Sequence, residues 1–108
     1  MSKLINHKIT LNEKRIMDIR IHKVRSSRTL YCIYAEAINM AFRDIEATGS
    51  YERDVRVYLN AGDIVPVTVS LPEDLTEKVK KLAKQIDISA KTVLREIIEF
   101  YALKTFLE

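Results

Sequence analysis

The sequence predicts a mainly α-helical fold with a short β ribbon, in which a strand, a helix and a longer helix follow one another twice. Two stretches alternate between apolar and polar residues, which is typical of strands, and others carry apolar residues at helical spacing. Only two glycines and two prolines occur in 108 residues, so few positions interrupt regular structure. A chain of this length forms one ordinary domain, or two very small units that share a core.

The segment 64–108 shows the pattern most clearly. Its strand is predicted by the alternating apolar residues Val65, Val67, Val69 and Leu71. Pro66 has no N–H group for a sheet ladder, so the strand should lie at a sheet edge or begin near this residue. One face of a helix follows in Leu75, Val79, Leu82 and Ile86. Ser89 is a suitable N-cap for a second, longer helix.

The segment 1–50 shows a similar but weaker pattern. Ile9 and Leu11 alternate with polar neighbours and predict a short strand. Residues 15–24 fit both helical spacing and strand alternation, and we favour a helix. An amphipathic helix is predicted over 30–47, and the sequence Thr-Gly-Ser that follows should end it.

The two halves therefore resemble each other. Ser26-Ser27-Arg28-Thr29-Leu30 parallels Ser89-Ala90-Lys91-Thr92-Val93, and Ile9-Thr10-Leu11 parallels Val67-Thr68-Val69. If these matches are equivalent positions, the helix that follows the first strand must be about five residues shorter than the helix that follows the second strand. We interpret the chain as a unit at 1–50, a linker at 51–63 and a unit at 64–108. A lone strand with two helices cannot pair its own backbone, so each strand needs a mate from the other half or from another chain.

The composition argues against several classes of protein. The single cysteine, Cys32, cannot form a disulfide within the chain and suits a reducing compartment; we expect it to be a small core residue. With only His7 and His22 beside it, no common zinc site can be assembled. No catalytic triad, glycine-rich phosphate loop or long apolar run is visible, and Glu96 and Glu99 are expected on a solvated helix face. We therefore expect a cytoplasmic protein that is not an enzyme and has no metal, cofactor, small-molecule substrate or membrane contact.

Positive charge is concentrated in the first half of the chain. Residues 1–50 carry nine Lys and Arg against five Asp and Glu, whereas residues 64–108 carry seven of each. A basic half beside a neutral half indicates a polyanionic partner, although a solvated basic face is the commoner explanation.

The second half resembles the ribbon-helix-helix family of DNA-binding proteins. The resemblance rests on Val67-Thr68-Val69-Ser70-Leu71-Pro72-Glu73-Asp74-Leu75, an amphipathic helix, and Ile88-Ser89-Ala90-Lys91-Thr92-Val93-Leu94-Arg95-Glu96-Ile97-Ile98-Glu99-Phe100-Tyr101. Two positions depart from the family pattern: Pro66, where a polar or basic residue is frequent, and Asp87, where a glycine is common. The whole chain resembles the rarer tandem form, found in regulators from archaeal filamentous viruses. This resemblance implies two ribbon-helix-helix units that form a pseudo-dimer.

In that family two antiparallel strands lie in the DNA major groove, and the N-termini of the longer helices meet backbone phosphates. Carried over by position, the resemblance implies base contacts from Lys8, Thr10, Asn12, Thr68 and Ser70. It implies phosphate contacts from Ser26, Ser27, Arg28, Thr29, Ser89, Lys91 and Thr92. The plain alternatives are the solvated side of an ordinary sheet for the first set and helix capping for the second, and capping is compatible with phosphate binding.

The resemblance therefore implies a sequence-specific transcriptional regulator, such as a repressor, that binds double-stranded DNA and forms homodimers. It would work in the cytoplasm, or in the host cytoplasm if the protein is viral. Two alternatives stay open. The chain could be an antitoxin or a plasmid-partition protein that binds DNA, or 64–108 alone could be a ribbon-helix-helix dimerisation module attached to an interaction domain at 1–63.

Overall fold

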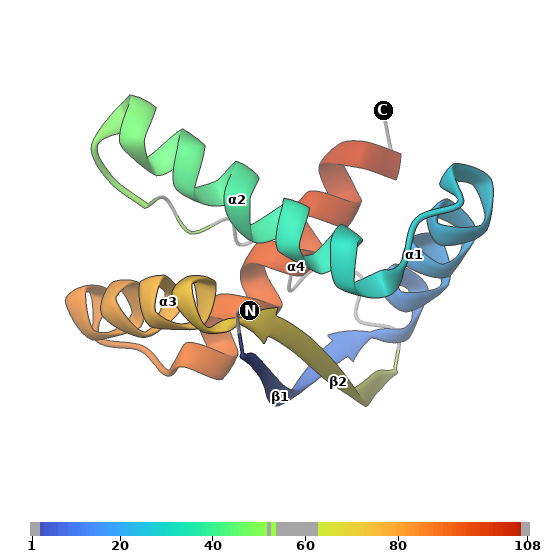
Figure 1. Cartoon of the computed structure of the whole chain (residues 1–108), viewed down its shortest axis with the longest axis horizontal. Helices are drawn as coiled ribbons and strands as arrows, with labels where there is room; N and C mark the ends of the chain where they lie inside the picture. Colours follow the sequence, from blue (N-terminus) through green and yellow to red (C-terminus); the bar gives the residue numbers. More distant parts are fainter. Residues whose placement is uncertain (1–2, 52, 54–62, 107–108) are drawn as a thin grey trace.

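The computed structural model describes residues 3–51, 53 and 63–106, and one order of elements occurs twice along them (Figure 1). The elements are β1 (Leu4–Asn12), α1 (Glu13–Ser26), α2 (Leu30–Thr48), β2 (Ile64–Pro72), α3 (Glu73–Ile86) and α4 (Ala90–Phe106). The prediction of a mainly helical chain with a short ribbon is confirmed, and the ambiguous segment 15–24 is helical. Most of the predicted linker at 51–63 lies outside the described residues. No helix in the described part is both long and apolar enough to cross a membrane.

The two strands pair with each other inside one chain, as a two-stranded antiparallel sheet. The register is centred on Lys8 opposite Thr68, so it is unchanged when the two halves are exchanged. The same exchange relates two backbone hydrogen bonds that hold the helix starts. Glu13 N donates to Asp63 O at 2.8 Å, and Glu73 N donates to Lys3 O at 3.0 Å. Each strand therefore finds its mate in the other half of the same chain.

The elements repeat at a constant spacing of 60 residues. Leu4 and Ile64, Glu13 and Glu73, and Leu30 and Ala90 begin equivalent elements. Both α1 and α3 have 14 residues, so the prediction that the first helix is about five residues shorter is wrong. The error arose from both matches, because the structural equivalent of Ser89 is Thr29 rather than Ser26, and that of Ile9 is Val69 rather than Val67.

The turns between the paired helices explain this spacing. Ser27 and Asp87 both adopt the left-handed conformation, with φ of 56° and 60°, directly after α1 and α3. Glycine is the usual residue at such a position because it has no Cβ, but Asp tolerates it. Thr29 then caps α2 by accepting from Cys32 N at 3.2 Å. Asp87 thus occupies a position at which glycine is usual, and the turn forms without one.

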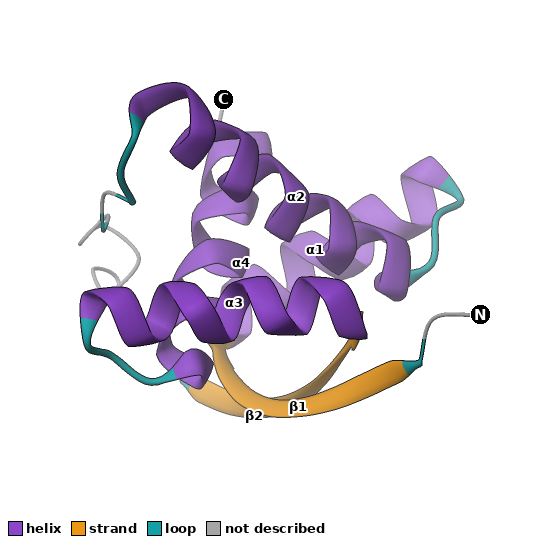
Figure 2. Cartoon of the chain, turned by 60° about the vertical axis from the view of Figure 1, so that its left-hand side comes forward, coloured by secondary structure: helices purple, strands orange, loops and turns teal. Residues whose placement is uncertain are grey.

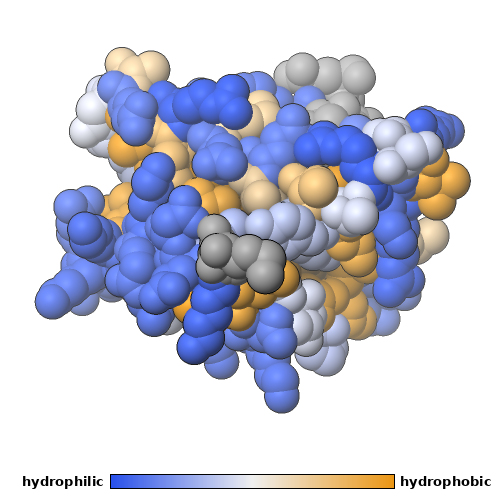
Figure 3. Space-filling model, viewed as in Figure 1, coloured by the Kyte–Doolittle hydropathy of each residue, from blue (hydrophilic) through white to orange (hydrophobic). Residues whose placement is uncertain are grey.

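All four helices lie on one face of the ribbon (Figure 2). The ribbon contributes Ile9, Leu11, Val69 and Leu71 to the core. Helix α4 contacts β1 and helix α2 contacts β2, so each long helix packs on the strand of the other half. Helix α3 turns charged residues to solvent, and hydrophilic side chains gather over it (Figure 3). Neither half therefore encloses a core of its own.

Two expectations about the long helices are wrong. Glu96 and Glu99 are buried, with exposed fractions of 1% and 0%, because α4 is covered by β1, α2 and α3 and both carboxylates pair with arginines. Cys32 is exposed, because it lies in the first turn of α2, where the helix begins at the surface.

Candidate nucleic-acid interface

The outer side of the sheet, which we call the ribbon face, consists of alternate residues of the two strands. Its members are Asn6, Lys8, Thr10, Pro66, Thr68 and Ser70. They pair across the sheet as Asn6 with Ser70, Lys8 with Thr68, and Thr10 with Pro66. Five are exposed and Ser70 is half-buried. Four of the five residues predicted to contact bases thus share one surface, opposite the face that packs on the helices.

Asn12 does not belong to this surface, so its predicted outward orientation is wrong. Only 3% of it is exposed, and its side-chain oxygen caps α1 by accepting from Lys14 N at 2.9 Å. Its backbone N–H donates to the buried carboxylate of Glu99 at 3.4 Å. Strand alternation alone would turn residue 12 outward, but β1 runs directly into α1 and the cap turns the side chain inward. Asn is a preferred N-cap residue, which was the available signal.

Asn6 was not predicted but lies on the ribbon face. Its side-chain oxygen accepts a hydrogen bond of 2.6 Å from the hydroxyl of Ser70 across the sheet. This contact orients the amide, whose nitrogen carries the hydrogen donors. The predicted strand began only near Ile9, whereas β1 starts at Leu4.

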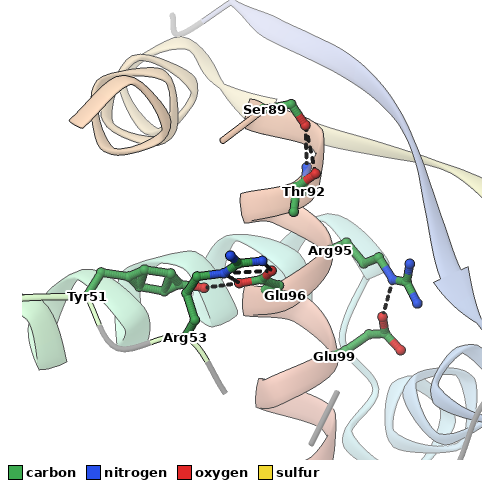
Figure 4. A network of polar contacts seen from close by, with 7 residues as sticks. All are labelled: Tyr51, Arg53, Ser89, Thr92, Arg95, Glu96 and Glu99. Atoms are coloured by element: carbon green, nitrogen blue, oxygen red, sulfur yellow. Dashed lines mark hydrogen bonds and ion pairs between the residues drawn. The ribbon is translucent and has the colours of Figure 1, made fainter. Parts of the chain in front are cut away.

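The start of α4 lies beside the ribbon face. Ser89 Oγ accepts from Thr92 N at 3.1 Å and lies 2.8 Å from Thr92 Oγ1 (Figure 4). Lys91 is exposed in the same turn. A surface hollow joins this helix start to the ribbon, lined by Lys8, Ile9, Thr10, Pro66, Lys91, Thr92 and Arg95. The structure therefore brings together predicted base-contact and phosphate-contact residues.

The equivalent residues of the first half are arranged differently from the prediction. Of Ser26, Ser27, Arg28 and Thr29, only Thr29 caps the longer helix. Ser26 is the last residue of α1, and its hydroxyl donates to His22 O at 2.7 Å. Ser27 forms the left-handed turn. The prediction that these two serines stand at a helix N-terminus is thus wrong, because the longer helix begins later.

Arg28 is occupied by a carboxylate of its own chain. Its guanidinium forms an ion pair with Glu36, which also accepts from the Tyr101 hydroxyl at 3.0 Å. The hydrogen bond from Arg28 holds the pKa of Glu36 below its ordinary value, although some burial opposes this, and the same bond raises the pKa of Arg28. Contact with a phosphate would have to compete with this pair.

Glu96 is the structural equivalent of Glu36, and its carboxylate also contacts an arginine and a tyrosine hydroxyl. Arg53 donates to both of its oxygens, from Nε at 3.1 Å and from Nη2 at 2.6 Å, and the Tyr51 hydroxyl lies 3.2 Å from Oε1 (Figure 4). Each half therefore holds one glutamate between an arginine and a tyrosine. The pair at Glu96 ties α4 to the chain that follows α2.

Within the described ranges, no group of three or more His, Cys, Asp or Glu side chains is placed to hold a metal ion.

No family model matches the chain, and neither the curated proteins nor the solved structures contain a significant match to it.

Proposed function

We propose that the chain is a sequence-specific DNA-binding protein of the tandem ribbon-helix-helix type and acts as a transcriptional regulator. The observation that carries the proposal is the exposed polar ribbon face with a basic helix start beside it. The DNA major groove, about 12 Å wide, admits a two-stranded ribbon. Lys8 can donate to guanine, the amide of Asn6 can pair with adenine, and Thr68 can meet a thymine methyl or a polar base edge.

Phosphate contacts would come mainly from the start of α4. The first N–H groups of a helix and the positive end of its dipole favour an anion, and Ser89, Lys91 and Thr92 surround this end. Such contacts set the orientation of the protein on the duplex, while the ribbon face supplies discrimination between bases.

One chain supplies both strands of the ribbon, so one chain should suffice for one ribbon in one groove. A homodimer would then place two ribbons on neighbouring sites of the same duplex. Occupation of DNA in this way would block other proteins, which is the simplest basis for repression.

The test is the salt dependence of binding to duplex DNA. The logarithm of the association constant should fall linearly with the logarithm of salt concentration, by about 0.9 for each phosphate contact. Replacement of Lys91 by Ala should lower this slope by about one contact. The matched control is Lys104→Ala, because Lys104 lies in the last turn of α4, about 20 Å further along the helix at 1.5 Å per residue.

Binding that ignores salt, or no binding at all, would refute the proposed function. If Lys91→Ala and Lys104→Ala change the salt slope equally, the positive charge of Lys91 contributes no more than a distant one. The start of α4 would then not be part of the DNA interface.

A further inference from the structure

We infer that the DNA site read by one ribbon is not a palindrome about that ribbon and that each chain binds its site in one orientation. This inference rests on the proposed function and names the class of site that the ribbon face recognises. In a symmetric dimer both halves of a ribbon carry the same residues, so both half-sites must match. Here the register has the same symmetry, but the residues that it relates are different.

The ribbon face differs at each equivalent pair of positions. At the centre, Lys8 lies opposite Thr68, so an amine stands on one side of the centre and a hydroxyl on the other. Towards one end, Asn6 lies beside Ser70 and the two are hydrogen-bonded. At the corresponding place towards the other end, Thr10 lies beside Pro66, which has no polar side-chain atom. The two half-sites therefore meet different hydrogen-bonding groups.

The helix starts differ in the same sense. Counted 60 residues apart, Lys91 and Thr92 of α4 correspond to Tyr31 and Cys32 of α2. The hollow that contains Lys91 also contains Thr10 and Pro66, so the cation of α4 lies towards that end of the ribbon. By the twofold symmetry that relates the two halves, the start of α2 lies towards the opposite end of the ribbon, where Asn6 pairs with Ser70. The phosphate backbone is therefore held more strongly at the α4 end.

The chain carries a convenient probe for orientation. Cys32 is its only cysteine, is exposed, and lies in the first turn of α2. An iron chelate attached to this thiol cleaves DNA close to its position. A single good base contact placed at the wrong base weakens binding by roughly 5- to 150-fold. On a duplex that carries the site of a single chain, we therefore expect cleavage at one end of that site to exceed that at the other by at least about fivefold.

The matched variant Cys32→Thr, Thr92→Cys moves the probe to the equivalent position on α4. Cleavage should then move to the opposite end of the same site, with the bound fraction of DNA held equal in both experiments. Sites selected from random duplexes should also lack inverted-repeat symmetry about the position of the ribbon.

The outcomes separate the two ideas. Failure to bind any duplex refutes the proposed function. Binding with equal cleavage at both ends from Cys32, or selection of an inverted repeat about the ribbon, leaves the proposed function standing and overturns the inference of one orientation.

Discussion

The pairing of Arg95 with Glu99 gives the sharpest test of the packing that holds the ribbon on the helices. Glu99 is fully buried, with an exposed fraction of 0%, while 19% of the Arg95 side chain is exposed. Arg95 Nε donates to Glu99 Oε2 at 2.6 Å, and the backbone N–H of Asn12 reaches Oε1 at 3.4 Å. The carboxylate thus stands between α4 and the junction of β1 with α1, and Arg95 provides its short hydrogen bond.

The two single substitutions should differ in cost. Among the described residues, Arg95→Ala leaves the buried carboxylate with only the long backbone contact. Breaking a buried ion pair typically costs about 3–5 kcal/mol. Glu99→Ala leaves a partly exposed guanidinium that water can reach, so we expect the smaller cost of a charged hydrogen bond, about 1.5–3 kcal/mol. The double variant Arg95→Met, Glu99→Leu contains neither charge and should cost clearly less than the sum of the two.

Urea unfolding followed by circular dichroism measures these differences. For a small domain the free energy of unfolding changes by about 1–3 kcal/mol per molar urea, so a loss of about 3 kcal/mol moves the midpoint by roughly 1–3 M. Single costs below about 1 kcal/mol, or costs that simply add in the double variant, would show that the buried carboxylate does not depend on Arg95.

Two further substitutions test side chains of β1 that contact the helices. Burial lowers the pKa of His7 from its ordinary value of 6.5, and Lys80 lowers it further, while His7 Nε2 lies 3.0 Å from Thr76 Oγ1. Because the unfolded chain then binds the proton more tightly, the free energy of unfolding should fall as the pH falls below 6.5. In urea unfolding, His7→Gln should make the free energy of unfolding less dependent on pH in this range. An unchanged pH dependence would contradict the lowered pKa of His7. In the same assay, Asn12→Ala should lower the free energy of unfolding by about 1 kcal/mol through loss of the helix cap. Asp is an equally good cap, but Asn12→Asp should cost at least as much because its negative charge would lie near Glu99. An Asn12→Asp variant as stable as the original chain would argue against that proximity.

The existence and type of the described elements other than α1 could be predicted from the sequence, because the two periodicities are local properties; for α1 both periodicities fitted residues 15–24, and helix was only the favoured choice. The alignment of the two halves could not. Ser26, Ser27 and Thr29 are all acceptable N-cap residues within one short stretch, and no glycine marks the end of α1. Only the left-handed conformation of Ser27 shows where the turn lies.

The burial of Glu96 was missed for a different reason. A polar position on a helix is normally solvated, and the partner of Glu96 is Arg53, which lies 43 residues away in the chain. Nothing local to α4 indicates that contact. The opposite error at Cys32 has the same origin, because its apolar neighbours suggested burial whereas the start of α2 lies at the surface.

The comparison of equivalent positions shows where the two halves differ. In the core, Leu11 corresponds to Leu71 and Ile38 to Ile98, so the packing is the same in kind. On the outer side of the ribbon and at the helix starts, hydroxyl, amine, amide and aromatic groups replace one another. A homodimer cannot vary its two halves separately, since every substitution appears twice. One chain that contains both halves can change one strand or one helix start while the shared core stays intact, and it is at the proposed DNA surface that this freedom would alter specificity.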